Sequence, residues 1–187
     1  MQSHSQDQGR LTMRWFTADW HLGETRMDIM GRPFDNARTQ TWALVNSHNA
    51  LIKPEDELVI IGDVCFKDAP KYTLEALRKF HCRKTLIRGN HDRGYTDEEL
   101  RVYFDTVVAE GDGLEYEIDG IKCYATHYPT GGRPDRFNLV GHIHGAWKVQ
   151  LNMLNVGIDV HHFRPVPETQ VSFYLNAITN FYDSDVW

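Results

Sequence analysis

The sequence predicts an α/β fold, a four-layer α/β/β/α sandwich in which two mixed β-sheets lie inside and helices cover them outside. Three observations lead to this prediction: strand and helix patterns alternate in the first half of the chain, strand patterns dominate the second half, and no linker or repeat divides the two. The 187 residues suffice for one sizeable core, and 41% hydrophobic with 25% charged residues is typical of a folded protein. We therefore expect one domain over residues 13–187, preceded by a flexible extension at residues 1–12.

The first half of the chain predicts three strands and three helices. Apolar runs indicate buried strands at residues 13–18, 57–62 and 84–89. Helical patterns are found at residues 36–52, 70–80 and 96–104. Pro54 stops the first helix, and Thr96 is a typical cap for the third, which carries acidic residues in its first turn.

The second half of the chain predicts mainly strands. They are expected at residues 106–111, 114–120, 121–127, 137–142 and 150–157. Asp119-Gly120 is a typical two-residue hairpin turn and joins the second of these strands to the third. Residues 168–180 are expected to form a closing helix.

The composition indicates the compartment and the class of partner. The formal net charge of −6 argues against binding long nucleic acid through a broad basic face. No apolar run approaches the ~20 residues that a membrane span requires. Residues 1–12 lack the apolar core of a signal peptide, and our hypothesis is that Met13 is the original start of the protein. Cys65, Cys82 and Cys123 lie outside any C-x-x-C motif, which favours reduced core thiols. We expect a cytoplasmic protein without a membrane partner, and the oligomeric state stays open.

Polar side chains follow five of the predicted strands, at the point where each strand ends. They are Asp19 and His21, then Asp63, then Asn90 and His91, then His127, and finally His142 and His144. Because residues two apart in an extended backbone project to the same side, Asp19 and His21 should point at one place. The same argument applies to His142 and His144. Glycines that permit tight turns or close approach to a ligand precede three of the groups, at Gly62, Gly89 and Gly141.

The chemistry of these side chains favours a metal centre. Two aspartates, four histidines and Asn90 offer oxygen and nitrogen ligands without a thiolate, which suits divalent first-row metals and not a structural zinc of the cysteine type. Seven ligands are too many for one tetrahedral ion but suit two ions that share a carboxylate, an arrangement that acts on phosphate esters. Any one of these residues alone more often has a structural role than a functional one. Their combination favours a functional role. The other histidines His4, His48 and His81 are given no role.

The ordered blocks D-x-H, G-D, G-N-H-D, H and G-H-x-H resemble the signature of the calcineurin-like metallophosphoesterase superfamily. All five are present in order from Asp19 to His144. The resemblance implies the metallo-dependent phosphatase fold, a two-sheet sandwich flanked by helices. The stretches GRPF at residues 31–34 and NVGID at residues 155–159 are similar to those of a subgroup of small bacterial and phage phosphoesterases.

The resemblance also implies a role for each matched residue. The first metal ion would be held by Asp19, His21 and His144, and the second by Asn90, His127 and His142. The Asp63 carboxylate would bridge the ions, and His91 and Asp92 would form the catalytic pair, His91 as the proton donor and Asp92 as its orienter. The cofactors would be two divalent ions, with Mn favoured and Fe, Ni, Co or Zn as alternatives. A hydroxide bridging them would attack phosphorus.

One departure from the superfamily narrows the expected substrate. Its protein serine/threonine phosphatases follow G-D with an acid and an arginine, whereas residues 62–68 read GDVCFKD and lack that arginine. We therefore expect a phosphodiesterase that hydrolyses a phosphodiester or small nucleotide. The alternatives are a phosphomonoesterase acting on a small molecule and a non-catalytic scaffold of the same fold. Intact metal ligands and an intact His91 disfavour the scaffold.

Further residues are candidates for the rim of the site. Five arginines are candidates for binding substrate, although a solvated surface charge is the commoner role for each alone: Arg32, Arg88, Arg93, Arg133 and Arg136. Residues 130–136, which are rich in glycine, are expected to form a mobile loop at the rim. His161 and His162 are expected at the surface or rim. Core packing is expected of the aromatic residues that flank ligands, which are Trp20, Tyr128 and Trp147.

Overall fold

The structure is a computed structural model that describes residues 12–65, 69 and 71–181. The extension expected at residues 1–12 therefore lies, except for residue 12, outside the described residues. His4, and Pro70 as the expected first residue of a helix, lie outside them as well. Residues 66–68, in the stretch GDVCFKD, also lie outside the described part of the chain.

Two mixed five-stranded sheets form the inside of the molecule, as predicted. The first sheet has the order β10-β1-β2-β3-β4, with bounds β1 Arg14–Thr17, β2 Glu57–Ile61, β3 Arg83–Ile87, β4 Thr106–Val108 and β10 Val166–Pro167. Strands β1 to β4 are parallel and β10 is antiparallel, with Phe16 opposite both Val59 and Val166. The second sheet has the order β5-β6-β7-β9-β8, with bounds β5 Gly113–Ile118, β6 Ile121–Thr126, β7 Phe137–Val140, β8 Val149–Gln150 and β9 Met153–Asn155. Its central strands β6, β7 and β9 are parallel, and β5 and β8 are antiparallel edges.

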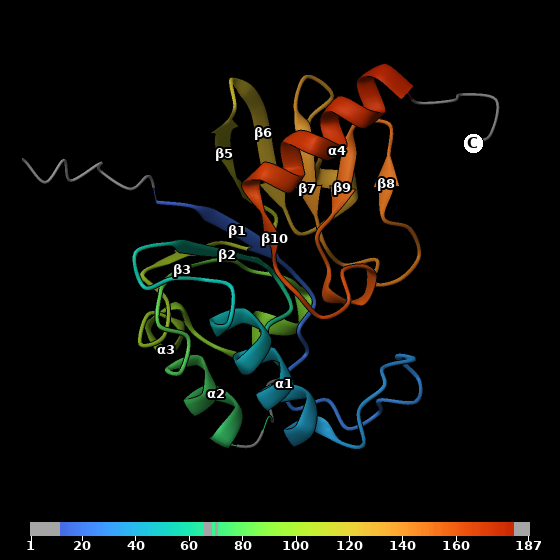
Figure 1. Ribbon diagram of the computed structural model, residues 1–187. Helices are drawn as coiled ribbons and strands as arrows, with labels where there is room; N and C mark the ends of the chain where they lie inside the picture. Colours follow the sequence, from blue (N-terminus) through green and yellow to red (C-terminus); the bar gives the residue numbers. More distant parts are fainter. Residues whose placement is uncertain (1–11, 66–68, 70, 182–187) are drawn as a thin grey trace, which may run out of the picture.

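The first three helices lie outside the first sheet, whereas the buried residues Val171 and Ile178 of the last helix join the apolar cluster that both sheets share. The helix bounds are α1 Ala37–Asn49, α2 Lys71–Leu77, α3 Asp97–Leu100 and α4 Glu168–Phe181. Figure 1 shows α1, α2 and α3 on the side of the first sheet that faces away from the second sheet, while α4 crosses the second sheet. The predicted α/β sandwich is thus confirmed.

Local sequence signals explain where several elements begin and turn. The side chain of Asn36 accepts hydrogen bonds from the backbone N–H groups of Arg38 and Thr39 and so caps α1. Thr96 and Glu99 form the reciprocal capping box of α3, although this helix ends at Leu100 and not at residue 104 as predicted. Asp119 and Gly120 have φ angles of 51° and 78°, the left-handed pair that a tight hairpin turn requires.

Strands β1 and β2 at the centre of the first sheet are buried on both faces, which explains their apolar sequences. Leu58 and Ile60 of β2 face a cluster that also contains the buried residues of α1 and α2. Val59 and Ile61 alternate with them and face a second cluster, shared with the second sheet. The three cysteines Cys65, Cys82 and Cys123 are buried free thiols, as expected. Among the described residues, no helix has both the length and the apolar character that a membrane crossing requires.

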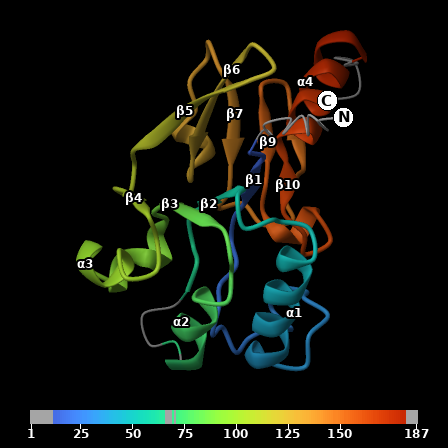
Figure 2. The ribbon, with the colours of Figure 1, turned by 60° about the vertical axis from the view of Figure 1, so that its left-hand side comes forward.

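Parallel strands of both sheets end at one common region, which Figure 2 shows between the two sheets. Beyond β1, the backbone N–H of Asp19 donates to the carbonyl of Gly62, which follows β2. The carbonyl of Ala18 accepts from the backbone N–H of Ile158, which follows β9 of the other sheet. The polar segments that end the strands are therefore hydrogen-bonded to one another across the two sheets.

Candidate metal centre

The donors expected at the strand ends have an unexpected backbone conformation. Five of them adopt positive φ angles between 47° and 74°, namely Asp19, His21, Asp63, His142 and His144. The prediction that Asp19 and His21, or His142 and His144, lie in extended backbone is therefore wrong. Left-handed conformations cost roughly 1–3 kcal/mol each for residues with a Cβ and persist only where the surrounding structure holds them. Hydrogen bonds provide such support, for example from the backbone N–H of His21 to the carbonyl of Asp63 at 2.9 Å.

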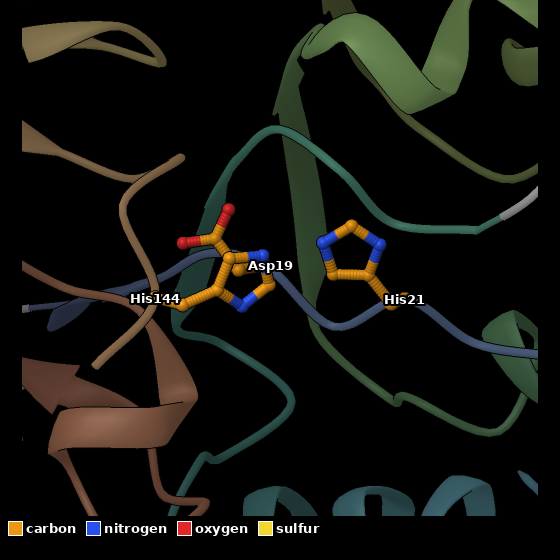
Figure 3. Close-up of side chains that lie close together, drawn as sticks. All are labelled: Asp19, His21 and His144. Carbon is orange, nitrogen blue, oxygen red and sulfur yellow. The ribbon is translucent and has the colours of Figure 1, made fainter. Parts of the chain in front are cut away.

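A first group of ligand atoms comes from Asp19, His21 and His144. One donor atom from each lies within 4.8 Å of the other two, and Figure 3 shows the three side chains together. The rings of His21 and His144 are stacked with their centroids 4.9 Å apart. Asp19 accepts the backbone N–H of His142 on both carboxylate oxygens, at 2.9 and 3.0 Å, and so connects the segment after β1 with the segment after β7.

A second group comes from Asp63, His127 and His142, whose donor atoms also lie within 4.8 Å of one another. The Nδ1 atom of His127 is 2.9 Å from the carbonyl oxygen of Ile61, which directs the Nε2 atom to the group. Asn90 belongs to this region too, since its Oδ1 atom lies 3.3 Å from the Nε2 atom of His127. The structure thus brings all seven expected ligands to one place.

Asp63 lies between the two groups. Its Oδ2 atom is 3.5 Å from the Nε2 atom of His21 and also 3.5 Å from the Nε2 atom of His127. Its other oxygen, Oδ1, accepts the backbone N–H of His91 at 2.9 Å. One carboxylate oxygen is therefore positioned to serve both groups.

Burial and charge make this region favourable for cations. Burial raises the pKa of Asp19 to about 6 and lowers the pKa of His21 to about 3, because each group is kept from water. Burial also raises the pKa of Asp63, but the hydrogen bond and charge of His127 outweigh it and bring this pKa below its usual value. Conversely, burial lowers the pKa of His127, and Asp63 more than offsets this and raises it. The carboxylates therefore attract positive charge into a buried place lined by imidazoles, as a cation site requires.

The close packing and the donor set fit divalent metal ions. A Cβ atom at Gly62 would lie 2.3 Å from the Nδ1 atom of His127, and one at Gly89 would lie 2.2 Å from the Oδ1 atom of Asp63. Only glycine permits the donors to approach the backbone this closely. Carboxylate, imidazole and amide donors without a thiolate suit ions such as Mn, Fe, Co, Ni or Zn.

The expected catalytic pair lies beside these groups. The ring of His91 is perpendicular to that of His21, with centroids 4.7 Å apart, and His91 also groups with His21 and Asp63. Asp92 is fully buried, and burial raises its pKa to about 6. Its carboxylate accepts the backbone N–H groups of Asp63, Val64 and Gly89 at 2.8–2.9 Å. These bonds hold together the turns after β2 and β3, whereas the sequence predicted that Asp92 orients His91.

Each of the five candidate arginines is paired with a carboxylate. The pairs are Arg32 with Asp159, Arg88 with Asp97, Arg93 with Glu110, Arg133 with Glu115, and Arg136 with Asp135 and Glu115. The side chain of Arg32 is 0% exposed and also donates to the carbonyl oxygens of Asp19 and Trp20, so it is better assigned to structure than to a substrate contact. Arg93 and Arg133 are exposed, and Arg133 also lies over the ring of Tyr124.

Other residues near the site differ from expectation. His161 is buried, with its Nε2 atom 2.8 Å from the carbonyl oxygen of Asn155, so the prediction of a surface or rim position is wrong for this residue. Trp20 packs in the core as predicted, whereas Tyr128 and Trp147 are half-buried. A short 3₁₀ turn, Pro129–Gly131, includes the first two residues of the rim loop expected at residues 130–136.

The sequence reasoning missed two carboxylates. Asp159 lies 2.8 Å from the Nδ1 atom of His144, and Glu110 accepts the hydroxyl of Tyr128 at 2.5 Å. The stretch NVGID, which ends at Asp159, is similar to that of a subgroup but carries no local signal of the contact with His144. No spacing signal identifies Glu110, because it reaches the site from the segment after β4.

Comparisons with known proteins identify a family and a shared fold. Residues 14–177 match the family model described as calcineurin-like phosphoesterase. A solved structure of a protein of unknown function from Aquifex aeolicus is similar, with a TM-score of 0.70 and 20% identity over 87% of this chain and 99% of that chain, which shows a shared fold. A structure described as a novel archaeal phosphodiesterase has a TM-score of 0.43 and 12% identity over 78% of this chain and 82% of that chain. No curated protein matches the sequence.

Proposed function

Since this chain belongs to the calcineurin-like phosphoesterase family, whose members are metal-dependent phosphoester hydrolases, we propose that it hydrolyses a phosphodiester or a small nucleotide at a binuclear metal centre. The observation that carries the proposal is the position of Asp63. Its Oδ2 atom is 3.5 Å from an imidazole nitrogen of each ligand group. One carboxylate oxygen shared by two groups of donors is the arrangement that a pair of ions requires.

The ligands divide into two sets around the shared carboxylate of Asp63. In this proposal the first ion would be held by Asp19, His21 and His144, and the second by Asn90, His127 and His142. Manganese is the favoured ion, with Fe, Ni, Co and Zn as alternatives. When bound, the ions lower the pKa of a coordinated water and neutralise charge on the phosphate oxygens.

The protein supplies positioning and a proton. His91 donates the proton that the departing oxygen needs, from an imidazole packed beside His21. The backbone N–H of His91 donates to Asp63, so the proton donor and the shared ligand are fixed relative to each other. Asp92 holds the turns that carry both residues through its bonds to the backbone of Asp63 and Gly89.

The charges around the site favour a diester over a monoester. A phosphate monoester is largely a dianion near neutral pH, whereas a diester carries one negative charge. Each of the five candidate arginines already faces a carboxylate, so none of them adds an uncompensated positive charge for the second negative charge. The net charge of −6 likewise favours a small substrate over long nucleic acid.

Other features of the proposal concern location and subgroup. Three buried free thiols support a reducing compartment, and we propose the cytoplasm. Similarity of residues 31–34 and 155–159 to small bacterial and phage phosphoesterases supports membership of that subgroup.

Hydrolysis of two chromogenic esters tests the proposal. The purified protein is stripped with chelator, reloaded with Mn, Co, Ni or Zn, and assayed with bis-p-nitrophenyl phosphate and p-nitrophenyl phosphate. We expect metal-dependent hydrolysis that is faster with the diester. Faster hydrolysis of the monoester would identify a phosphomonoesterase. Two bound equivalents of metal without turnover of any ester would identify a scaffold, and turnover unaffected by chelator would refute the metal centre.

A further inference from the structure

We infer that Asp159 and Arg32 are positioning residues that prepare His144 and the Asp19–His21 segment for the first metal ion. This inference depends on the metal centre proposed above. Asp159 and Arg32 form a buried ion pair that contacts the proposed ligands but is not itself one of them.

Asp159 fixes the proton of the His144 ring. It lies in a short 3₁₀ turn, Ile158–Val160, and its Oδ2 atom is 2.8 Å from the Nδ1 atom of His144. An ionised carboxylate only accepts hydrogen bonds, so the Nδ1 atom must be the donor. The neutral ring then carries its proton on Nδ1 and presents the lone pair of Nε2 to the metal site.

Arg32 keeps Asp159 charged and in place. Its Nε atom donates to Oδ1 at 2.8 Å and its Nη2 atom donates to Oδ2 at 2.9 Å, a forked pair with two parallel bonds. The Arg32 side chain is 0% exposed and that of Asp159 is 10% exposed.

The same guanidinium reaches the other ligands of the first group. Its Nη2 atom donates to the carbonyl oxygen of Asp19 at 2.6 Å, and its Nη1 atom donates to the carbonyl oxygen of Trp20 at 2.8 Å. These carbonyls lie between Asp19 and His21, whose φ angles of 59° and 48° need support from their surroundings. Arg32 therefore stabilises the strained segment after β1 and, through Asp159, the histidine from the segment after β7.

The second ligand group has a separate anchor. The Nδ1 atom of His127 meets the backbone carbonyl of Ile61 at 2.9 Å, and this bond involves neither Asp159 nor Arg32. Loss of the Asp159 carboxylate should therefore lower the affinity for the first ion and leave the affinity for the second ion nearly unchanged. This selectivity separates a positioning role from a general structural one.

The first experiment measures the His144 proton without metal. In chelator-treated protein labelled with ¹⁵N-histidine, long-range ¹H–¹⁵N spectra distinguish the two neutral tautomers from each other and from the doubly protonated ring. The His144 signals are assigned from their loss in His144→Gln. We expect His144 to carry its proton on Nδ1, and a proton on Nε2 would overturn the inference. Because this test uses the wild-type protein without an ion, its outcome is independent of the proposed function.

The second experiment measures Mn²⁺ binding to Asp159→Asn by calorimetry. The wild type should bind two equivalents, and binding of no Mn²⁺ by the wild type would refute the proposed metal centre itself. In Asp159→Asn we expect the affinity for one equivalent to fall about 10–100-fold while the other is retained. Unchanged affinity for both, or equal weakening of both, would overturn the inference. If this variant fails to fold, the tautomer of His144 measured in the wild-type protein tests the inference alone.

A matched control is available at the opposite end of β2. Asp56 is a buried carboxylate that accepts from the backbone N–H groups of Met13 and Lys53 and from the Nε1 atom of Trp15. Asp56→Asn should lower stability without changing either Mn²⁺ affinity. If Asp56→Asn reproduced the selective loss, the effect of Asp159→Asn would be a general consequence of destabilisation, and the inference would fail.

Discussion

Gly89 faces Asp63 so closely that a Cβ atom at residue 89 would lie 2.2 Å from the Oδ1 atom of the carboxylate. It would also lie 2.8 Å from the Cε1 atom of His127. The backbone of Gly89 has φ −101° and ψ −178°, which other residues adopt readily. The need for glycine here is therefore steric and comes from the approach of the two ligands.

Gly89→Ala should consequently damage both the fold and the metal centre. We expect a loss of about 1–3 kcal/mol in the free energy of unfolding, typical of forcing extra volume into a packed site, together with loss of metal-dependent hydrolysis. Urea unfolding and the diester assay measure the two effects. Gly145→Ala is the control, because a Cβ atom there meets nothing within 4 Å. Equal stability and activity of the two variants would show that the crowding at Gly89 has no consequence.

Asp63→Asn should remove the negative charge that the two proposed ligand groups share. The amide keeps an oxygen to accept the N–H of His91 but loses the negative charge that lies 3.5 Å from His21 and His127. We expect the rate of hydrolysis to fall by more than about 10²-fold, because loss of a residue that only supports a metal ligand already costs up to about 10²-fold. We also expect at least one equivalent of bound metal to be lost. Metal analysis and diester kinetics check this, with Asp56→Asn as the control. A variant that kept two equivalents and wild-type rates would remove Asp63 from the bridging position.

His91→Gln should retain the metals and slow only the proton-dependent step. A general acid contributes about 10²–10⁴-fold to rate, and most when the leaving oxygen is strongly basic. We therefore expect a large loss with alkyl esters and a small loss with p-nitrophenyl esters. The ratio of the two rates, compared with that of the exposed-surface control His81→Gln, measures the effect. An unchanged ratio would assign proton donation to another group.

His48 should make stability depend on pH. It is fully buried in α1 and packs edge-on against the rings of Trp20 and Phe80, and burial lowers its pKa from 6.5 to about 3. As the pH falls below 6.5, the unfolded chain binds a proton that the folded protein does not accept until about pH 3. The free energy of unfolding therefore falls with decreasing pH across this window, by up to about 1.4 kcal/mol per pH unit for one histidine.

The variant His48→Leu isolates this contribution. Urea unfolding of chelator-treated protein at about pH 7 and pH 5 should show a smaller loss of stability on acidification in His48→Leu than in the wild type. His81→Gln should behave as the wild type does, because its side chain is exposed. The same acid loss in all three proteins would mean that His48 is not the titrating group.

The order of strands and helices was predictable because each carries a local signal. The apolar runs of β2 and β3, the Asn36 cap and the Asp119-Gly120 turn each identify one element without reference to the rest of the chain. The strand expected at residues 150–157 instead divides into β8 and β9, which pair antiparallel across a turn at residues 151–152. Element boundaries of this kind depend on tertiary pairing, which short-range patterns do not encode.

That the proposed ligands lie close together was predictable from the sequence, but their backbone geometry was not. Their residue types and ordered spacing identify Asp19 to His144, whereas the left-handed φ angles arise from hydrogen bonds between segments of different strands. The role of Asp159 could not be read from the sequence, because His144 is 15 residues away and Arg32 is 127 residues away. A lone aspartate after a glycine and an isoleucine gives no local sign of either partner.

The distribution of donors between the two sheets has a consequence for biosynthesis. Each ligand group includes a histidine that follows β7, His144 in one and His142 in the other. A nascent chain on the ribosome thus exposes Asp19, His21 and Asp63 long before either cage can close. The two proposed ligand groups are completed only when His142 and His144 have been synthesised, so a truncated product that ends before His142 would lack a histidine of each group.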